Sequence, residues 1–138
     1  MTATTATTAV RPRRVLAIVS WTLQVLLGAF FIFVSVPKLT LHPDVVVGFS
    51  ALGTGHWFIY FVGACELAGG IGLMIPRLSG VAAIGLAGLM IGATITNLFL
   101  LPGMASAAVV TVALGVAFVF IARLRARQTR ALIRQLKR

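Results

Sequence analysis

Four long apolar stretches constrain this chain more than any other feature. They cover residues 15–36, 57–75, 78–101 and 104–122, and the only charged side chain inside them is that of Glu66. Each stretch reaches the length of about 17–25 residues that a helix needs to cross the hydrocarbon core of a bilayer. A backbone in lipid must satisfy its own hydrogen bonds, which an α-helix does within one segment. The sequence therefore predicts an all-α fold, a transmembrane four-helix bundle.

The composition excludes several other classes of protein. Of the 138 residues, 59% are hydrophobic and 10% are charged, and the formal net charge is +10. A disordered chain would be far more polar, and a soluble nucleic-acid-binding domain would be less apolar. Cys65 is the one cysteine of the sequence, which rules out a disulfide framework and a cysteine-cluster metal site.

The basic residues predict how the bundle is oriented. If the chain crosses four times, the arginines before the first stretch, Arg77 and the basic C-terminal segment all fall on one side of the membrane. Lys38 alone falls on the other side. The positive-inside rule then places the N and C termini in the cytoplasm. The predicted organisation is a disordered basic tail over residues 1–14, a transmembrane domain over 15–122 and a basic cytoplasmic tail over 123–138.

The C-terminal tail has two interpretations. Arg123, Arg127, Arg130 and Arg134 recur at helical spacing, so the fourth span can continue as a helix with a cationic stripe. The favoured interpretation is an anchor that rests on anionic lipid headgroups. The alternative is nucleic-acid binding, but the tail has no interleaved aromatic residues and no groove-reading motif. No nucleic-acid partner is therefore expected.

The loop between the first two stretches, residues 37–56, is predicted to lie in the outer interface as a lid on the bundle. Four of its apolar residues share helical spacing: Leu41, Val45, Phe49 and Leu52. Asp44 is suited to cap a short helix there. Trp57 and Tyr60 then sit at headgroup level, as an aromatic belt does.

Glu66 is the most informative residue of the sequence. It is the middle residue of the second stretch and therefore lies near the bilayer midplane, where an acidic side chain is a functional-site candidate by default. It is either a ligand-binding or proton-linked acid, or a polar clamp between helices. Gln24 and Thr111 lie at a similar depth at a rise of about 1.5 Å per residue. The three residues are predicted to form one polar layer.

A second group of polar residues lies nearer to the outer surface. Asn97 and Thr94 share one face of the third span and are further candidates for ligand contacts. Lys38 either turns inward to stabilise an ionised Glu66 or extends to the interface. Three outer-mouth residues have the side chains of metal ligands but match no metal motif in their spacing: His42, Asp44 and His56. Neither a metal site nor a catalytic residue set is predicted.

Small residues predict where the helices approach each other closely. Gly88 and Gly92 form a pair four residues apart in the third span, the spacing of a close-packing motif. Similar small-residue faces occur in the second and fourth spans: Ala64, Ala68 and Gly72, and Thr111 with Gly115.

Three motifs together resemble those of the DoxX-like family of small bacterial four-span membrane proteins. They are Gly28-Ala29-Phe30-Phe31-Ile32-Phe33 followed by Ser35 and Pro37-Lys38-Leu39, then Gly63-Ala64-Cys65-Glu66-Leu67-Ala68-Gly69-Gly70, then Met90-Ile91-Gly92-Ala93. The resemblance runs from about Val15 to Ala122. Family members typically have a glycine before the lysine of the first motif, where this chain reads Ser35-Val36-Pro37-Lys38. The resemblance implies a four-helix membrane bundle in which Lys38 and Glu66 match recurrent charged positions.

The resemblance implies function only in outline, because relatives include a subunit associated with thiosulfate:quinone oxidation, members of oxidative-stress complexes and proteins with cargo or chaperone roles. The favoured hypothesis is a non-enzymatic subunit of the bacterial cytoplasmic membrane that binds a quinone, a lipid, another hydrophobic small molecule or a partner protein and is accessory to a redox system. One alternative is a small proton-coupled transporter that uses Glu66. Another is a membrane oxidoreductase subunit, although the spans contain no histidine pair for a haem.

Overall fold

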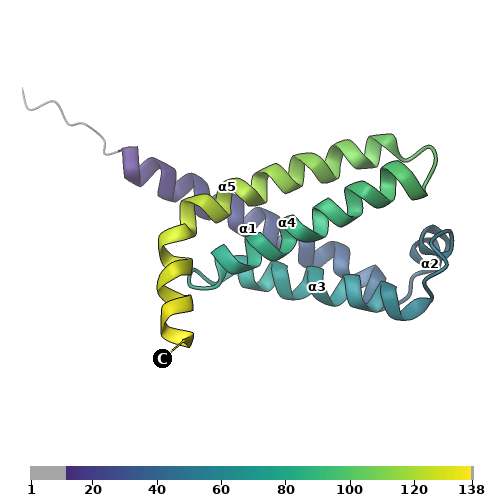
Figure 1. The fold of residues 1–138 in the computed structure, drawn as a ribbon, viewed down its shortest axis with the longest axis horizontal. Helices are drawn as coiled ribbons and strands as arrows, with labels where there is room; N and C mark the ends of the chain where they lie inside the picture. Colours follow the sequence, from purple (N-terminus) through teal and green to yellow (C-terminus); the bar gives the residue numbers. More distant parts are fainter. Residues whose placement is uncertain (1–11, 138) are drawn as a thin grey trace, which may run out of the picture.

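The computed structural model describes residues 12–137, and these are helical with short connections (Figure 1). The elements are α1 (Pro12–Leu39), α2 (Pro43–Ser50), α3 (His56–Met74), α4 (Ser79–Ile95), the π-helical turn η1 (Thr96–Leu100) and α5 (Ala105–Leu136). The described part holds four helical segments that are long and apolar enough to cross a membrane: Arg14–Leu39, His56–Met74, Ser79–Leu100 and Ala105–Arg127. The predicted all-α fold with four spans is confirmed.

The four long helices form two pairs. Helix α1 packs along α3, α4 packs along α5, and contacts between α3 and α4 join the pairs (Figure 1). The start of α1 and the α3–α4 turn lie at one end of the bundle, whereas α2 and the α4–α5 connection lie at the other. Basic residues at the start of α1, in the α3–α4 turn and in the C-terminal part of α5 therefore share one end. That this end faces the cytoplasm stays a prediction.

The core lies between the two pairs and is built from large apolar side chains. The Phe31 ring of α1 meets the Phe118 ring of α5 edge-on, with centroids 5.2 Å apart, and both rings are fully buried. Phe30 and Phe33, by contrast, are 46% and 76% exposed. Many other apolar side chains of the long helices also face outward. An apolar outer surface is what a bundle surrounded by lipid requires.

Glycines set the close approach of α1 to α3. A Cβ atom at Gly70 would lie 2.8 Å from the carbonyl oxygen of Gly28, and a Cβ at Gly28 would lie equally close to that of Gly70. Gly63 faces Lys38 in the same way, because its Cβ would lie 2.9 Å from the Cβ of Lys38. Real Cβ contacts are almost never shorter than 3.0 Å. Side chains at these positions would therefore force α1 and α3 apart.

The predicted close-packing pair Gly88 and Gly92 does not join helices within the described chain. A Cβ atom at either position would find no atom within 4 Å. In α3, Ala64 and Ala68 are exposed, and Gly72 is the member of that face that meets α4, at Ala82. The face of Thr111 in α5 does pack on α4, because its hydroxyl lies 2.7 Å from that of Thr94.

Helix α1 extends past the predicted end of the first span. It continues through Pro37 to Leu39, so Lys38 belongs to its last turn. Leu41 then reverses the chain with a φ of 51°, a left-handed conformation typical of a helix C-terminus. Leu41 therefore lies outside α2 and apart from the apolar face on which it was predicted. Helix α2 begins at Pro43 with His42 in the N-cap position, so the expected capping by Asp44 does not occur.

The structure describes the predicted C-terminal tail but little of the predicted N-terminal tail. Residues 1–11 lie outside the described part of the chain, and Pro12 already belongs to α1. The basic C-terminal segment continues α5 as one helix to Leu136. Figure 1 shows that this last part of α5 turns away from the direction of its spanning part and lies across the end of the bundle. The predicted continuation of the fourth span as a helix is confirmed.

Candidate functional site

A cavity of about 490 Å³ lies at the α2 end of the bundle, and we call it the lid cavity because α2, the segment predicted as a lid, forms part of its wall. Its walls come from the end of α1, from α2, α3 and α4, and from the segment between α4 and α5. Its polar lining is Lys38, Glu66, Thr96 and Asn97. Its volume falls within the range of about 300–1,000 Å³ that is usual for small-molecule sites.

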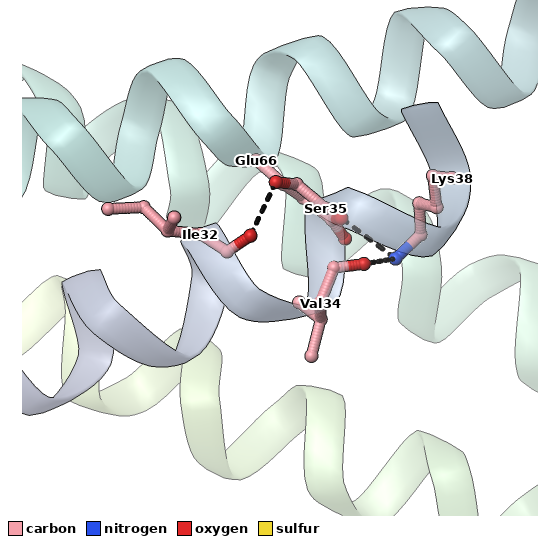
Figure 2. A network of polar contacts seen from close by, with 5 residues as sticks. All are labelled: Ile32, Val34, Ser35, Lys38 and Glu66. Carbon is pink, nitrogen blue, oxygen red and sulfur yellow. Dashed lines mark hydrogen bonds and ion pairs between the residues drawn. The ribbon is translucent and has the colours of Figure 1, made fainter. Parts of the chain in front are cut away.

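Lys38 and Glu66 form an ion pair in the wall of this cavity. The Lys38 Nζ atom lies 2.7 Å from the Glu66 Oε2 atom and also donates a hydrogen bond of 3.2 Å to the carbonyl oxygen of Val34 (Figure 2). Glu66 is 6% exposed, and the Lys38 side chain is 17% exposed. Of the two orientations considered for Lys38, the structure has the inward one. The ammonium group also lies at the C-terminus of α1, where the helix dipole favours a positive charge.

Three residues of α3, spaced at about one and two helical turns, explain why Glu66 lies here. Gly63, Glu66 and Gly70 share one buried face of the helix, and both glycines contact α1. Because the glycines let the two backbones approach, the carboxylate reaches the last turn of α1. The glycine-rich motif around Glu66 is therefore the packing surface that brings the two charges together.

Asn97 contributes an amide to the same cavity from the π-helical turn η1. The turn is closed by a hydrogen bond from the Leu101 amide to the Thr96 carbonyl oxygen, 3.1 Å long. The half-buried side chain of Asn97 makes no hydrogen bond to another described residue. The Glu66 Oε2 atom is fully buried and, apart from its ion pair with Lys38, makes no aligned hydrogen bond to the described residues. The Asn97 amide can therefore bond a guest, whereas the buried Oε2 atom of Glu66 is held by Lys38.

Aromatic side chains form the apolar wall of the lid cavity. Phe49 of α2 lies against Phe58 of α3 with ring centroids 6.1 Å apart, and Phe58 stacks on Phe61 at 6.5 Å. Val45 and Leu52 line the cavity from the same side as Phe49, as their spacing predicted. Helix α2 thus contacts α3 through the Phe49–Phe58 ring pair, and it lines the same cavity as the ion pair.

Three of the predicted polar residues have other partners. Gln24 is buried and donates a hydrogen bond of 2.7 Å to the Ser20 hydroxyl within α1. The hydroxyl groups of Thr94 and Thr111 are hydrogen-bonded to each other, and both residues line an apolar groove between α4 and α5. Glu66 is paired with Lys38. In place of one polar layer, the described residues form three separate contacts: one within α1, one between α4 and α5, and one between α1 and α3.

The outer-mouth residues lie near the lid but outside the cavity lining. His42 Nδ1 lies 3.5 Å from Asp44 Oδ2 at the start of α2, and both side chains are largely exposed. His56 begins α3 and is exposed. The described residues hold no cluster of three or more His, Cys, Asp or Glu side chains that could bind a metal.

The sequence did not predict that two glycines and most of the aromatic residues would line the lid cavity. Gly88 and Gly92 line the lid cavity, and the empty space beside them keeps it open. Phe58 and Phe61 are three residues apart in α3, a spacing that places them on one face, and this was the available signal. Met104 lines the cavity from the α4–α5 connection, and no local pattern marks it.

The four spans and a charged, partly aromatic cavity define a multi-pass integral membrane protein. A scan against protein-family models matches the DoxX-like family over residues 22–122. The chain therefore belongs to the DoxX-like family. No curated protein and no solved structure matches the chain.

Proposed function

We propose that this protein is a non-catalytic membrane subunit that binds an amphiphilic small molecule, of quinone or lipid type, in the lid cavity. One observation carries the proposal. A single cavity of suitable volume combines an ion pair and a free amide with an aromatic wall. Small-molecule sites have this composition, with mostly apolar walls and a few polar groups that fix orientation.

The polar groups would hold the head of the guest. The Lys38 ammonium and the Asn97 amide can donate hydrogen bonds to carbonyl or phosphate oxygens, whereas the Glu66 carboxylate can accept from a hydroxyl. A quinone ring has the carbonyl oxygens for these donors and a flat face for Phe58 and Phe61. If a quinone is bound, it supplies electron transfer to or from a partner protein. The protein's own residues position it and exclude water.

The apolar tail of the bound molecule would extend through the side of the bundle into the surrounding lipid. Phe61 is 55% exposed, and Gly88 and Gly92 are also exposed, so the cavity wall reaches the apolar outer surface of α3 and α4. A hydrophobic molecule could then enter from the bilayer without crossing water. Helix α2, which follows α1 and precedes α3, contributes Val45, Gly48 and Phe49 to the cavity wall.

Filling the cavity tests the proposal. Gly88→Leu should lower the amount of quinone or lipid that co-purifies with the protein by about tenfold, because the new side chain occupies the binding volume. The measurement is mass spectrometry of organic extracts from protein purified in mild detergent. Gly85→Leu is the matched control, since Gly85 lies one turn earlier in α4, has equally open space and does not line the lid cavity. Equal extracts from both variants, or an empty wild type, would contradict the proposal.

The transporter alternative is kept because Glu66 lies on a membrane cavity. It predicts proton-coupled uptake of a small molecule in liposomes, and Glu66→Gln should abolish that uptake. If wild-type liposomes show no uptake while the extract contains a bound quinone or lipid, the binding function stands and the transporter alternative is rejected. The oxidoreductase alternative requires a bound chromophore. An absorption spectrum of the purified protein tests it, because a spectrum without chromophore bands would count against this alternative.

A further inference from the structure

The C-terminal part of α5 carries a row of cations along one side of the helix. The basic residues recur at intervals of four and three positions, which places them on one face of the helix. They are Arg123, Arg127, Arg130, Arg134 and Lys137, and each is exposed. At a rise of about 1.5 Å per residue, the row is about 20 Å long. We call this row the α5 cationic face.

The packing of α5 fixes the depth of this face. Thr129 is 6% exposed and lies against Gly80, where a Cβ atom would be 3.2 Å from the Thr129 Cβ. Gly80 is the second residue of α4 and therefore lies at the very end of a membrane-spanning segment. A helix that packs at this level and lies across the end of the bundle (Figure 1) is at the height of the lipid headgroups.

No acidic side chain of the chain is available to neutralise the face. The sequence has two acidic residues, and both lie in the lid region: Asp44 in α2 and Glu66 in α3, which is paired with Lys38. Arg77, exposed in the α3–α4 turn at the same end of the bundle, adds another positive charge. Anionic headgroups are the negative charges that a membrane places at this height.

We propose that the α5 cationic face is a binding site for the phosphates of anionic phospholipids. Arginine side chains form paired hydrogen bonds with phosphate oxygens, which favours retained lipids over a diffuse ion atmosphere. Bound headgroups would hold the C-terminal part of α5 flat on the bilayer and against Gly80. The site is distant from the lid cavity and does not depend on the function proposed for it.

The test uses the full chain in nanodiscs made from roughly equal amounts of phosphatidylglycerol and phosphatidylcholine. Native mass spectrometry after transfer to mild detergent measures how much phosphatidylglycerol remains bound relative to phosphatidylcholine. The wild type should be enriched in phosphatidylglycerol, and Arg127→Gln/Arg130→Gln/Arg134→Gln should lose about tenfold or more of that enrichment. The matched variant with lysine at the same three positions keeps the charge but loses the paired hydrogen bonds, and its enrichment should fall between those of the wild type and the glutamine variant.

Three results would overturn the proposal. They are a wild type without enrichment, a glutamine variant with wild-type enrichment, and preferential binding of a short DNA duplex by wild-type protein in the same anionic nanodiscs. If the glutamine variant fails to fold, the salt dependence of the wild type decides. Raising the salt from about 0.15 M to about 1 M should remove most of the enrichment, and an unchanged ratio contradicts the proposal.

Discussion

Lys38→Met is expected to destabilise the folded protein by about 2–3 kcal/mol, because it leaves the Glu66 carboxyl buried without its counter-charge. Removing one partner of a buried ion pair costs about 3–5 kcal/mol of stability. Because Lys38 is partly exposed, we expect the loss here to lie at or below the lower end of that range. The measurement is the free energy of unfolding in detergent micelles, obtained by titration with a denaturing detergent and followed by circular dichroism.

Two further variants control this prediction. Lys137→Met removes the other lysine of the chain at an exposed position and should change the unfolding free energy by no more than about 0.5 kcal/mol. Lys38→Met/Glu66→Gln removes both charges and should recover most of the loss, since a neutral pair has no uncompensated charge. If Lys38→Met is as harmless as Lys137→Met, the ion pair does not hold α1 on α3.

Gly70→Leu should be the most damaging single change in the bundle, with a loss of about 3 kcal/mol or more. Even the first atom of the new side chain would lie 2.8 Å from the Gly28 carbonyl oxygen, which is backbone and cannot rotate away. Helix α1 would have to move off α3, which also separates Lys38 from Glu66. Unfolding in detergent micelles measures the loss, and cross-linking between α1 and α3 reports the separation.

Gly85→Leu is the control for this prediction too. It makes the same change in another spanning helix where a Cβ atom meets nothing within 4 Å, and it should alter the stability by about 1 kcal/mol at most. If the Gly70→Leu protein is as stable as the Gly85→Leu protein, the α1 and α3 backbones do not approach each other as closely as the structure shows. Loss of stability in both would indicate an effect of leucine itself.

The fold was predictable because lipid imposes one simple rule. Long apolar stretches must become helices, so the four spans and their order follow from the sequence alone. The last turn of α1 was not predictable, since Pro37 normally ends or bends a helix and the chain nevertheless continues to Leu39. That extra turn positions Lys38, and so a local detail decides the geometry of the site.

The candidate site was predictable only in part. Glu66 was identified by its depth, and Lys38 by its place at the outer mouth and by the family resemblance. Depth arithmetic failed for Gln24 and Thr111, because residues at one depth meet only if their helix faces point toward each other. Gly88 and Gly92 carry a close-packing motif but line a cavity, and sequence spacing cannot distinguish a glycine that is packed from one that leaves space.

Photo-cross-linking can show whether a hydrophobic molecule binds in the lid cavity. A photoreactive quinone analogue and a photoreactive fatty acid are each reacted with the protein in liposomes, and the labelled peptides are mapped by mass spectrometry. We expect labels concentrated on α2, on the Phe58–Glu66 segment of α3 and around Gly88 to Asn97, for one probe or for both. Gly88→Leu should remove these labels and Gly85→Leu should leave them. Labels spread evenly over the outer surface of the bundle, or unchanged by Gly88→Leu, would contradict binding in this cavity.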